Sequence, residues 1–291
     1  MTTAAPVALA KHHGLGNDFL VALGTAGDLV GIGAGEARRW CDRRRGIGAD
    51  GLLLGVLGEP DWDLVMRLHN ADGSVAEMSG NGIRCLAHAE LRRRGAPEEL
   101  TLRVLTGGGP RTVDVRPSPS ARATEVEASV DMGEARPGPA PTGDEPLPGS
   151  VAPAASGCGA ALGLRIKEEA TVDVGNPHLV RWVEGDLDAL DWVERSAADS
   201  ARFPGGVNVH WMQPTAGDPG ALDLRVWERG VGPTAACGTG AVAAAWAARR
   251  WGVVGERVVV HMPGGDVEVA LGDRLTLSGP SVFVADVVVP R

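Results

Sequence analysis

The sequence predicts an α/β protein built from two similar halves, because three landmarks recur in the same order roughly 160 positions apart. In each half a glycine-rich stretch begins a helix-like run that carries Ser or Cys at its first position. The matched stretches are Ser79-Gly80-Asn81-Gly82 with Cys237-Gly238-Thr239-Gly240, Gly16-Asn17-Asp18 with Gly175-Asn176-Pro177, and Gly46-Ile47-Gly48 with Gly205-Gly206-Val207. A repeat of this kind indicates a duplicated domain with one cleft shared by its two copies.

The composition supports two globular halves and excludes several classes of protein. A chain of 291 residues with 44% hydrophobic and 22% charged residues can form two cores of about 130 to 140 residues each. A net charge of -9 without a Lys/Arg-rich run argues against nucleic acid as the main partner. No apolar stretch reaches the roughly 18 residues that cross a membrane, and no secretion signal is seen. A cytoplasmic location is therefore expected.

In order along the chain, each half alternates short β-rich runs with helical stretches. Turn signals at Gly107-Gly108-Gly109-Pro110 and Pro117-Ser118-Pro119 separate the strands after the second helix, and a Pro/Gly/Ala-rich loop is expected at 136–163. The expected helices are 34–43 and 82–94, and the expected strands include Val104, 113–115, 126–132, 258–261, 267–270, 275–277 and 282–289. The last strands are expected to cross back to the first sheet, which gives domains of 1–128 with 278–291, and 129–277.

The two helix starts carry the strongest local chemistry. The first-turn N–H groups and the positive end of the helix dipole favour a bound carboxylate or phosphate, and glycines let the backbone approach it closely. A thiol at such a start is expected to have a lowered pKa, which makes Cys237 the best candidate base. The other cysteines, Cys41, Cys85 and Cys158, show no metal-binding spacing and are interpreted as reduced and structural.

At these residues the chain resembles diaminopimelate epimerase, a racemase-type family that needs no cofactor, over nearly its whole length. The resemblance implies that each half is a curled β-sheet around a central helix, with the active site in the cleft between them. It also implies an isomerase of lysine biosynthesis. The stretches that carry it are 13–19, Asn70-Ala71-Asp72-Gly73-Ser74, Gly80-Asn81-Gly82-Ile83-Arg84, Gly175-Asn176-Pro177-His178, Glu228-Arg229-Gly230-Val231-Gly232 and Ala236-Cys237-Gly238-Thr239-Gly240.

By this resemblance, two side chains at positions 79 and 237 act on opposite faces of the substrate α-carbon, one removing a proton and the other delivering one. The helix starts would bind the adjacent carboxylate, and Arg229 would grip a distal carboxylate. His178 and Glu228 resemble residues that tune the acid and base. The implied substrate contacts are Asn17, Asn70, Gly80, Asn81, Asn176, Asn208, Glu228, Arg229, Gly238 and Thr239.

Two positions depart from the family pattern. Ser79 stands where the first catalytic Cys belongs, and Pro233 replaces a family Glu. A hydroxyl is far less acidic than a thiol, so the two directions of reaction are expected to be unequal. Three explanations for Ser79 stay open: an engineered change made to trap a ligand, a natural Ser/Cys pair, or a paralogue with another substrate. An engineered change would not account for Pro233.

The main interpretation is an epimerase acting at the α-carbon of diaminopimelate or a closely related amino acid, without pyridoxal phosphate, metal or nucleotide. Lys11 and Lys167 are the only lysines, and neither has a setting that suggests a Schiff base. Two alternatives stay open: a paralogue using Cys237 as sole base for an isomerase or dehydratase reaction, and a catalytically silent amino-acid-binding protein. The resemblance is compatible with a homodimer, although the sequence does not fix the oligomeric state.

Overall fold

The computed structural model describes residues 5–95, 98–118, 120, 122–142, 165–188 and 192–290. The chain folds into two compact units, the first comprising Met1–Asp131 with Ser278–Arg291 and the second Met132–Leu277. The sequence predicted divisions after 128 and after 277.

The first unit is a closed β-barrel. Its strands pair in the order β17–β1–β2–β3–β4–β6–β7–β8, and β8 pairs with β17 to complete the ring. The last strand, β17, thus pairs with β1 and with β8 of this unit. The elements are β1 Val7–Gly14, β2 Asn17–Thr25, α1 Ala34–Trp40, β3 Gly51–Leu57, β4 Leu64–Asn70, β5 Val75–Ala76, α2 Gly80–Arg94, β6 Leu100–Thr106, β7 Gly109–Pro117, β8 Glu125–Gly133 and β17 Leu275–Val289.

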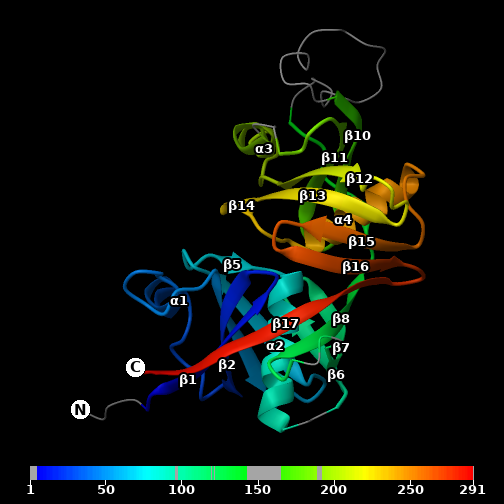
Figure 1. Ribbon diagram of the computed structural model, residues 1–291. Helices are drawn as coiled ribbons and strands as arrows, with labels where there is room; N and C mark the ends of the chain where they lie inside the picture. The colour runs from blue at the N-terminus through cyan, green and yellow to red at the C-terminus, as the bar shows by residue number, and fades with distance from the viewer. Residues whose placement is uncertain are drawn as a thin grey trace. The chain divides into compact units, whose positions relative to one another are not determined.

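Helix α2 lies among the strands of this barrel (Figure 1). Every residue from Gly80 to Leu91 is buried, including Arg84 and Glu90. The helix ends at Gly95, whose left-handed φ of 62° suits glycine. Glu90 is paired with Arg93 and Arg94 at 2.6 Å each, so its buried carboxylate is compensated. A helix buried on all sides explains why its sequence lacks one apolar stripe.

The outer face of the same sheet is covered by α1. Strand residues alternate, so that Leu52 and Leu54 pack with Trp40 on the outer face, whereas Leu53 points to the other face. Helix α1 was expected to continue to 43 but ends at Trp40. The backbone turns sharply there, because Ile47 N–H and Gly48 N–H both donate to the Trp40 carbonyl, at 2.8 and 3.0 Å.

The second unit repeats this order of pairing. Strands β10–β11–β12–β13–β15–β16 pair in sequence, with β14 beside β13 and β9 beside β10, and the parallel pairs occupy the same places as in the first unit. Helix α4 contacts β10, β11, β12, β13, β15 and β16, as α2 does its own strands. The elements are β9 Arg136–Pro137, β10 Arg165–Asp173, β11 Pro177–Glu184, α3 Trp192–Ser200, β12 Asn208–Pro214, β13 Ala221–Glu228, β14 Gly232–Thr234, α4 Gly238–Arg250, β15 Arg257–Met262 and β16 Gly265–Leu271.

The predicted fold class, two pseudosymmetric α/β halves with a curled sheet around a central helix, is confirmed for each unit. Three boundaries differ from the expectation. Helix α2 begins at Gly80 rather than 82, and the strands expected at 275–277 and 282–289 are one continuous strand, β17. The loop expected at 136–163 begins with the short strand β9, and its part from 143 onward lies outside the described residues.

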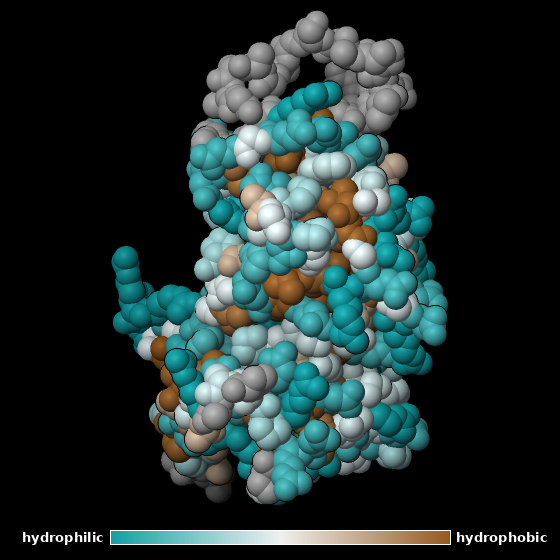
Figure 2. Space-filling view, turned by 45° about the vertical axis from the view of Figure 1, so that its right-hand side comes forward, coloured by the Kyte–Doolittle hydropathy of each residue, from teal (hydrophilic) through white to brown (hydrophobic). Residues whose placement is uncertain are grey.

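Charged groups are also buried in the second unit. Arg181 on β11 is fully buried and pairs with Glu169 on β10 and Asp199 on α3. Large apolar side chains that are exposed in the described residues are valines, such as Val30 and Val231. Figure 2 shows a brown apolar area on the second unit bordered by polar side chains.

Candidate active site

The two helix starts have the same local geometry. Ser79 precedes α2 with φ -142° and ψ 121°, and Cys237 precedes α4 with φ -135° and ψ 114°. Each side chain accepts a hydrogen bond from the backbone three residues on: Gly82 N–H to Ser79 Oγ at 3.0 Å, and Gly240 N–H to Cys237 Sγ at 3.4 Å. Both residues are therefore N-caps, and their polar atoms lie at the positive end of a helix dipole.

In the first unit the structure brings Asn17 and Asn81 together. The Asn81 side-chain amide donates to Asn17 Oδ1 at 3.2 Å, and the Asn17 amide donates to Asp50 Oδ2 at 2.8 Å. The buried guanidinium of Arg84 donates to Asn81 Oδ1 at 2.7 Å and to the Gly80 carbonyl at 3.2 Å. Arg84 thus fixes the side chain and backbone of the first helical turn.

Asn70 belongs to a separate turn at the end of β4. Its amide donates to Ser74 Oγ at 2.9 Å, and the Ser74 hydroxyl donates to Asp72 at 2.6 Å. Asn70 is thus held by the residues of its own turn, whereas Asn17 and Asn81 hold each other. Its predicted contact with substrate stays a prediction.

In the second unit Cys237 is enclosed. The residue is 5% exposed, and its sulfur lies 3.4 Å from the Thr239 hydroxyl. Burial and the negative charge of Glu228 raise the pKa of the Cys237 thiol, although the contacts from Thr239 and the Gly240 N–H lower it. The expected lowering of this pKa is therefore wrong, because desolvation outweighs the helix terminus. Cys237 rests as a thiol with a carboxylate beside it.

His178 connects two strands and the helix start. Its Nε2 lies 2.8 Å from Asn176 Oδ1, and its Nδ1 lies 2.8 Å from His210 Nε2. Asn176 in turn donates to Thr239 Oγ1 at 3.4 Å. Burial, followed by the charges of His210 and Arg229, holds the pKa of His178 well below its ordinary value, so the ring is neutral.

Asn208 and Arg229, two further predicted site residues of the second unit, are hydrogen-bonded to each other. Asn208 donates to the Pro177 carbonyl at 3.1 Å and accepts from the Arg229 backbone N–H at 3.0 Å. The exposed Arg229 guanidinium donates to the Gly205 carbonyl at 2.8 Å. Gly206 has a φ of 68°, and a Cβ there would lie 2.9 Å from Arg229 Cδ. Glycine is needed at this position for both reasons.

Pro233 lies in the short strand β14, opposite Trp227 on β13. Its neighbour Thr234 donates from its hydroxyl to Glu228 Oε1 at 2.6 Å. Glu228 is therefore held between β14 and the Cys237 thiol. The segment with the substituted position still supports the carboxylate that acts on the cysteine.

Cys41 and Cys85 both lie in the interior, and their interpretation as structural residues stays a prediction. Cys41 and Cys85 are buried as free thiols, and burial raises the pKa of each to about 12. Cys158 lies outside the described residues.

Two residues that contact predicted site residues were not themselves predicted from the sequence. Asp50 is a hydrogen-bond partner of Asn17, and His210 is one of His178. Asp50 had no signal beyond its place after the Gly46-Ile47-Gly48 turn. His210 does have such a signal. It lies two residues after Asn208 on one β-strand, so both side chains point to the same face of the sheet.

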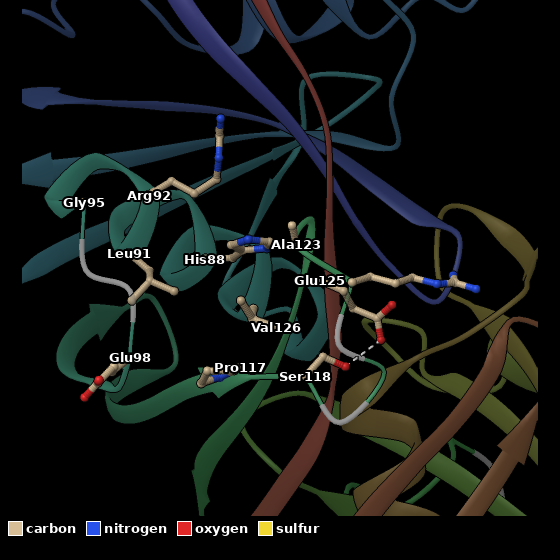
Figure 3. A pocket seen from close by; sticks show the side chains of 11 residues that line it. His88, Leu91, Arg92, Gly95, Glu98, Pro117, Ser118, Ala123, Glu125 and Val126 are labelled. Atoms are coloured by element: carbon tan, nitrogen blue, oxygen red, sulfur yellow. Dashed lines mark hydrogen bonds between the residues drawn. The ribbon is translucent and has the colours of Figure 1, made fainter.

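A cavity of about 320 Å³ in the first unit holds none of the predicted residues (Figure 3). It lies between the second half of α2 and the strands β7 and β8, and is lined by His88, Leu91, Arg92, Val126 and Pro117 among others. In the described ranges, no helix is long and apolar enough to cross a membrane. Nor do three or more His, Cys, Asp or Glu residues gather as metal ligands in that part of the chain.

Comparison with known proteins identifies similar sequences and folds. The family model for diaminopimelate epimerase matches residues 9–137 and 170–283. The diaminopimelate epimerase of Rhodococcus opacus (strain B4) is 42% identical over 298 residues, which cover 94% of each protein.

Two solved structures share the fold at low sequence identity. A hydroxyproline epimerase from Agrobacterium vitis, with bound trans-4-hydroxy-L-proline, superposes with a TM-score of 0.66 at 16% identity, over 98% of this chain and 92% of its own. A predicted epimerase from Pseudomonas aeruginosa gives a TM-score of 0.68 at 14% identity, over 97% of this chain and 98% of its own.

Proposed function

Because the chain belongs to the diaminopimelate epimerase family, we propose that it inverts the configuration at the α-carbon of diaminopimelate or a close relative, without a cofactor. The observation that carries the proposal is the pair of matching helix starts, each capped by a side chain that can take part in proton transfer. The dehydratase and silent-binding alternatives are not favoured, since the relatives matched over most of the chain are named as epimerases.

We assign substrate binding to the residues predicted from the sequence. The first-turn N–H groups of α2 and α4 would receive the carboxylate beside the reacting carbon. Arg229 would receive the distal carboxylate, because its guanidinium is exposed and positioned by the Gly205 carbonyl. Asn17, Asn70, Asn176 and Asn208 would supply polar contacts to the remaining groups.

The proton transfer proceeds through Cys237. Its thiol proton passes to the Glu228 carboxylate, and the resulting thiolate removes the α-proton of the substrate as the C–H bond breaks. The carbanion is stabilised by the helix-start N–H groups that bind the neighbouring carboxylate. A proton is returned on the opposite face by the Ser79 hydroxyl, directly or through water that restores its hydrogen, while Glu228 releases the thiol proton to solvent. This hydroxyl is a poor acid and a poorer base at neutral pH.

This mechanism predicts unequal exchange of the α-hydrogen. When L,L-diaminopimelate and the meso form are incubated separately in heavy water, α-deuterium measured by mass spectrometry should accumulate much faster from the form whose α-hydrogen faces Cys237. A Cys237→Ala variant should abolish this fast exchange. Comparable wild-type exchange from both forms would show that Ser79 is a competent base and would refute the assignment.

A further inference from the structure

His210 lies directly beneath the Cys237 helix start. The residue is fully buried on β12, and a Cβ built on Gly240 would lie 2.2 Å from its Cε1 atom. The imidazole therefore packs against the backbone whose N–H contacts the Cys237 sulfur. Burial lowers the pKa of His210 to about 3, so its ring is neutral at the pH where the enzyme would work.

The hydrogen bonds around His178 have one consistent direction. The Asn176 side-chain oxygen can only accept, so His178 Nε2 must carry the hydrogen in the 2.8 Å contact between them. A neutral His178 then has a bare Nδ1, which must accept from His210 Nε2. This leaves His210 Nδ1 without a hydrogen, and that buried atom has no partner among the described residues.

The same direction continues to the sulfur. The Asn176 amide donates to Thr239 Oγ1 at 3.4 Å, and Thr239 Oγ1 lies 3.4 Å from Cys237 Sγ. With its oxygen accepting from Asn176, the Thr239 hydroxyl can donate its hydrogen to the sulfur. We propose that His210 is a positioning residue for Cys237, which orients the chain His178, Asn176 and Thr239 so that every hydrogen points towards the thiolate.

Such a chain matters because the thiolate is otherwise disfavoured. Burial and the Glu228 charge both oppose ionisation of Cys237, and a donated hydrogen bond is one of the few features that favours the anion. Hydrogen bonds in series polarise one another, so the first donor strengthens the last. The charged groups that act on this chain are Glu228, on the thiol, and Arg229, on His178.

The first unit places apolar side chains where the second has imidazoles. Strand register pairs Phe19 with Gly51 there as it pairs His178 with Asn208 in the second unit, so Leu53 takes the place of His210. Accordingly, Leu53 is the residue that faces Gly82, the counterpart of Gly240. Among the described residues, the hydrogen-bonded chain that begins at His210 is therefore found only in the unit that carries Cys237.

This inference rests on the proposed function, but its first test needs no substrate. We would follow alkylation of Cys237 by iodoacetamide between pH 6 and 10, reading its peptide by mass spectrometry, in wild type, His210→Phe and His210→Gln. Phe keeps the ring volume and removes the N–H donor, whereas Gln keeps a donor. His88→Phe, in the first unit, is the matched control for loss of a buried histidine.

We expect His210→Phe to slow alkylation at pH 8 about fivefold, the value of one hydrogen bond, and to move the profile to higher pH. Its kcat should fall about as much, with KM within twofold, whereas His210→Gln and His88→Phe stay near wild type. A His210→Phe profile equal to wild type would overturn the inference. So would a Gln variant as slow as Phe, or an equal shift in the control. Absence of wild-type epimerisation would refute only the proposed function.

Discussion

Ser79 and Cys237 occupy the same backbone geometry but differ in chemistry. Both are N-caps with almost equal φ and ψ, and both accept from a glycine N–H three residues on. A hydroxyl in this setting stabilises the helix without becoming an anion near neutral pH. The thiol can ionise when its surroundings compensate for burial. Ser79 and Cys237 therefore differ in acidity and not in backbone position.

This comparison makes Ser79→Cys an informative substitution. Sulfur at position 79 should accept the Gly82 N–H as Cys237 accepts that of Gly240, so the local fold should survive. If a second thiol restores an acid and base on that side, exchange from the slow substrate form should rise by about a hundredfold, as is typical of general acid–base catalysis. Deuterium incorporation from each form measures it.

Ser79→Ala is the matched control, since it removes the hydroxyl without adding a thiol. It should cost about 1 kcal/mol of unfolding free energy through the lost cap and should leave exchange at position 79 slow. A large gain in Ser79→Cys alone favours an engineered change at this position. Little change in Ser79→Cys favours a natural Ser/Cys pair or a paralogue with another substrate.

At the scale of elements, the first turns of the two central helices pack against different side chains. In the first unit the side chain that faces the helix is Leu53 on β3, and in the second unit it is His210 on β12. A Cβ on Gly82 would meet Leu53 Cδ2 at 3.5 Å, an ordinary contact, and Ser79 Cβ at 3.1 Å. A Cβ on Gly240 would overlap the His210 ring. The glycine three residues after the cap is therefore required more strictly in α4 than in α2.

Gly240→Ala should lower the unfolding free energy by about 3 kcal/mol, because overpacking displaces a buried ring. Gly82→Ala should change it by less than about 1 kcal/mol, since the gain in helix propensity offsets the tight contact with Ser79. Urea unfolding of both variants measures the difference. Adding His210→Ala to Gly240→Ala should recover stability relative to His210→Ala alone. Equal losses in the two glycine variants would contradict this packing argument.

Sequence reasoning reached the duplicated fold because the repeat lies in short motifs with fixed spacing. It placed Ser79 and Cys237 at helix starts from glycines and the apolar run that follows. It misjudged the pKa of Cys237 and missed His210, because burial and the approach of β12 to α4 are tertiary facts. The division of β17 into two strands failed for a similar reason: pairing with β1 and β8 keeps the strand continuous across its polar residues.

At the scale of the whole molecule, the two units bury four histidines as neutral rings. Burial lowers the pKa of His12 to about 2, of His88 to about 4 and of His210 to about 3, and holds that of His178 well below its ordinary value. In the unfolded chain each ring takes a proton near pH 6.5. Below that pH the unfolded state binds more protons than the folded state, so stability must fall as the pH falls.

We therefore expect acid to unfold the protein at a mild pH. Each such histidine should cost about 1.5 kcal/mol between pH 6.5 and pH 5, and the sum approaches the whole stability of an ordinary domain. Glu169 acts in the opposite direction, because burial raises its pKa and the folded state holds its proton more tightly. Because four imidazoles lower the stability on acidification and Glu169 alone opposes them, the free energy of unfolding should fall as the pH falls. Urea unfolding at pH 7, 6 and 5 measures the slope.

Replacing one ring separates this explanation from general charge repulsion. His88→Phe removes one group that takes up a proton on unfolding, so the change in unfolding free energy between pH 6.5 and pH 5 should shrink by about a quarter of the histidine contribution. Net charge differs little between the two proteins at pH 7, where the imidazole is mostly neutral. If the pH slope of His88→Phe matched that of wild type, the buried imidazoles would not be the source of acid sensitivity, and repulsion among surface charges would take their place.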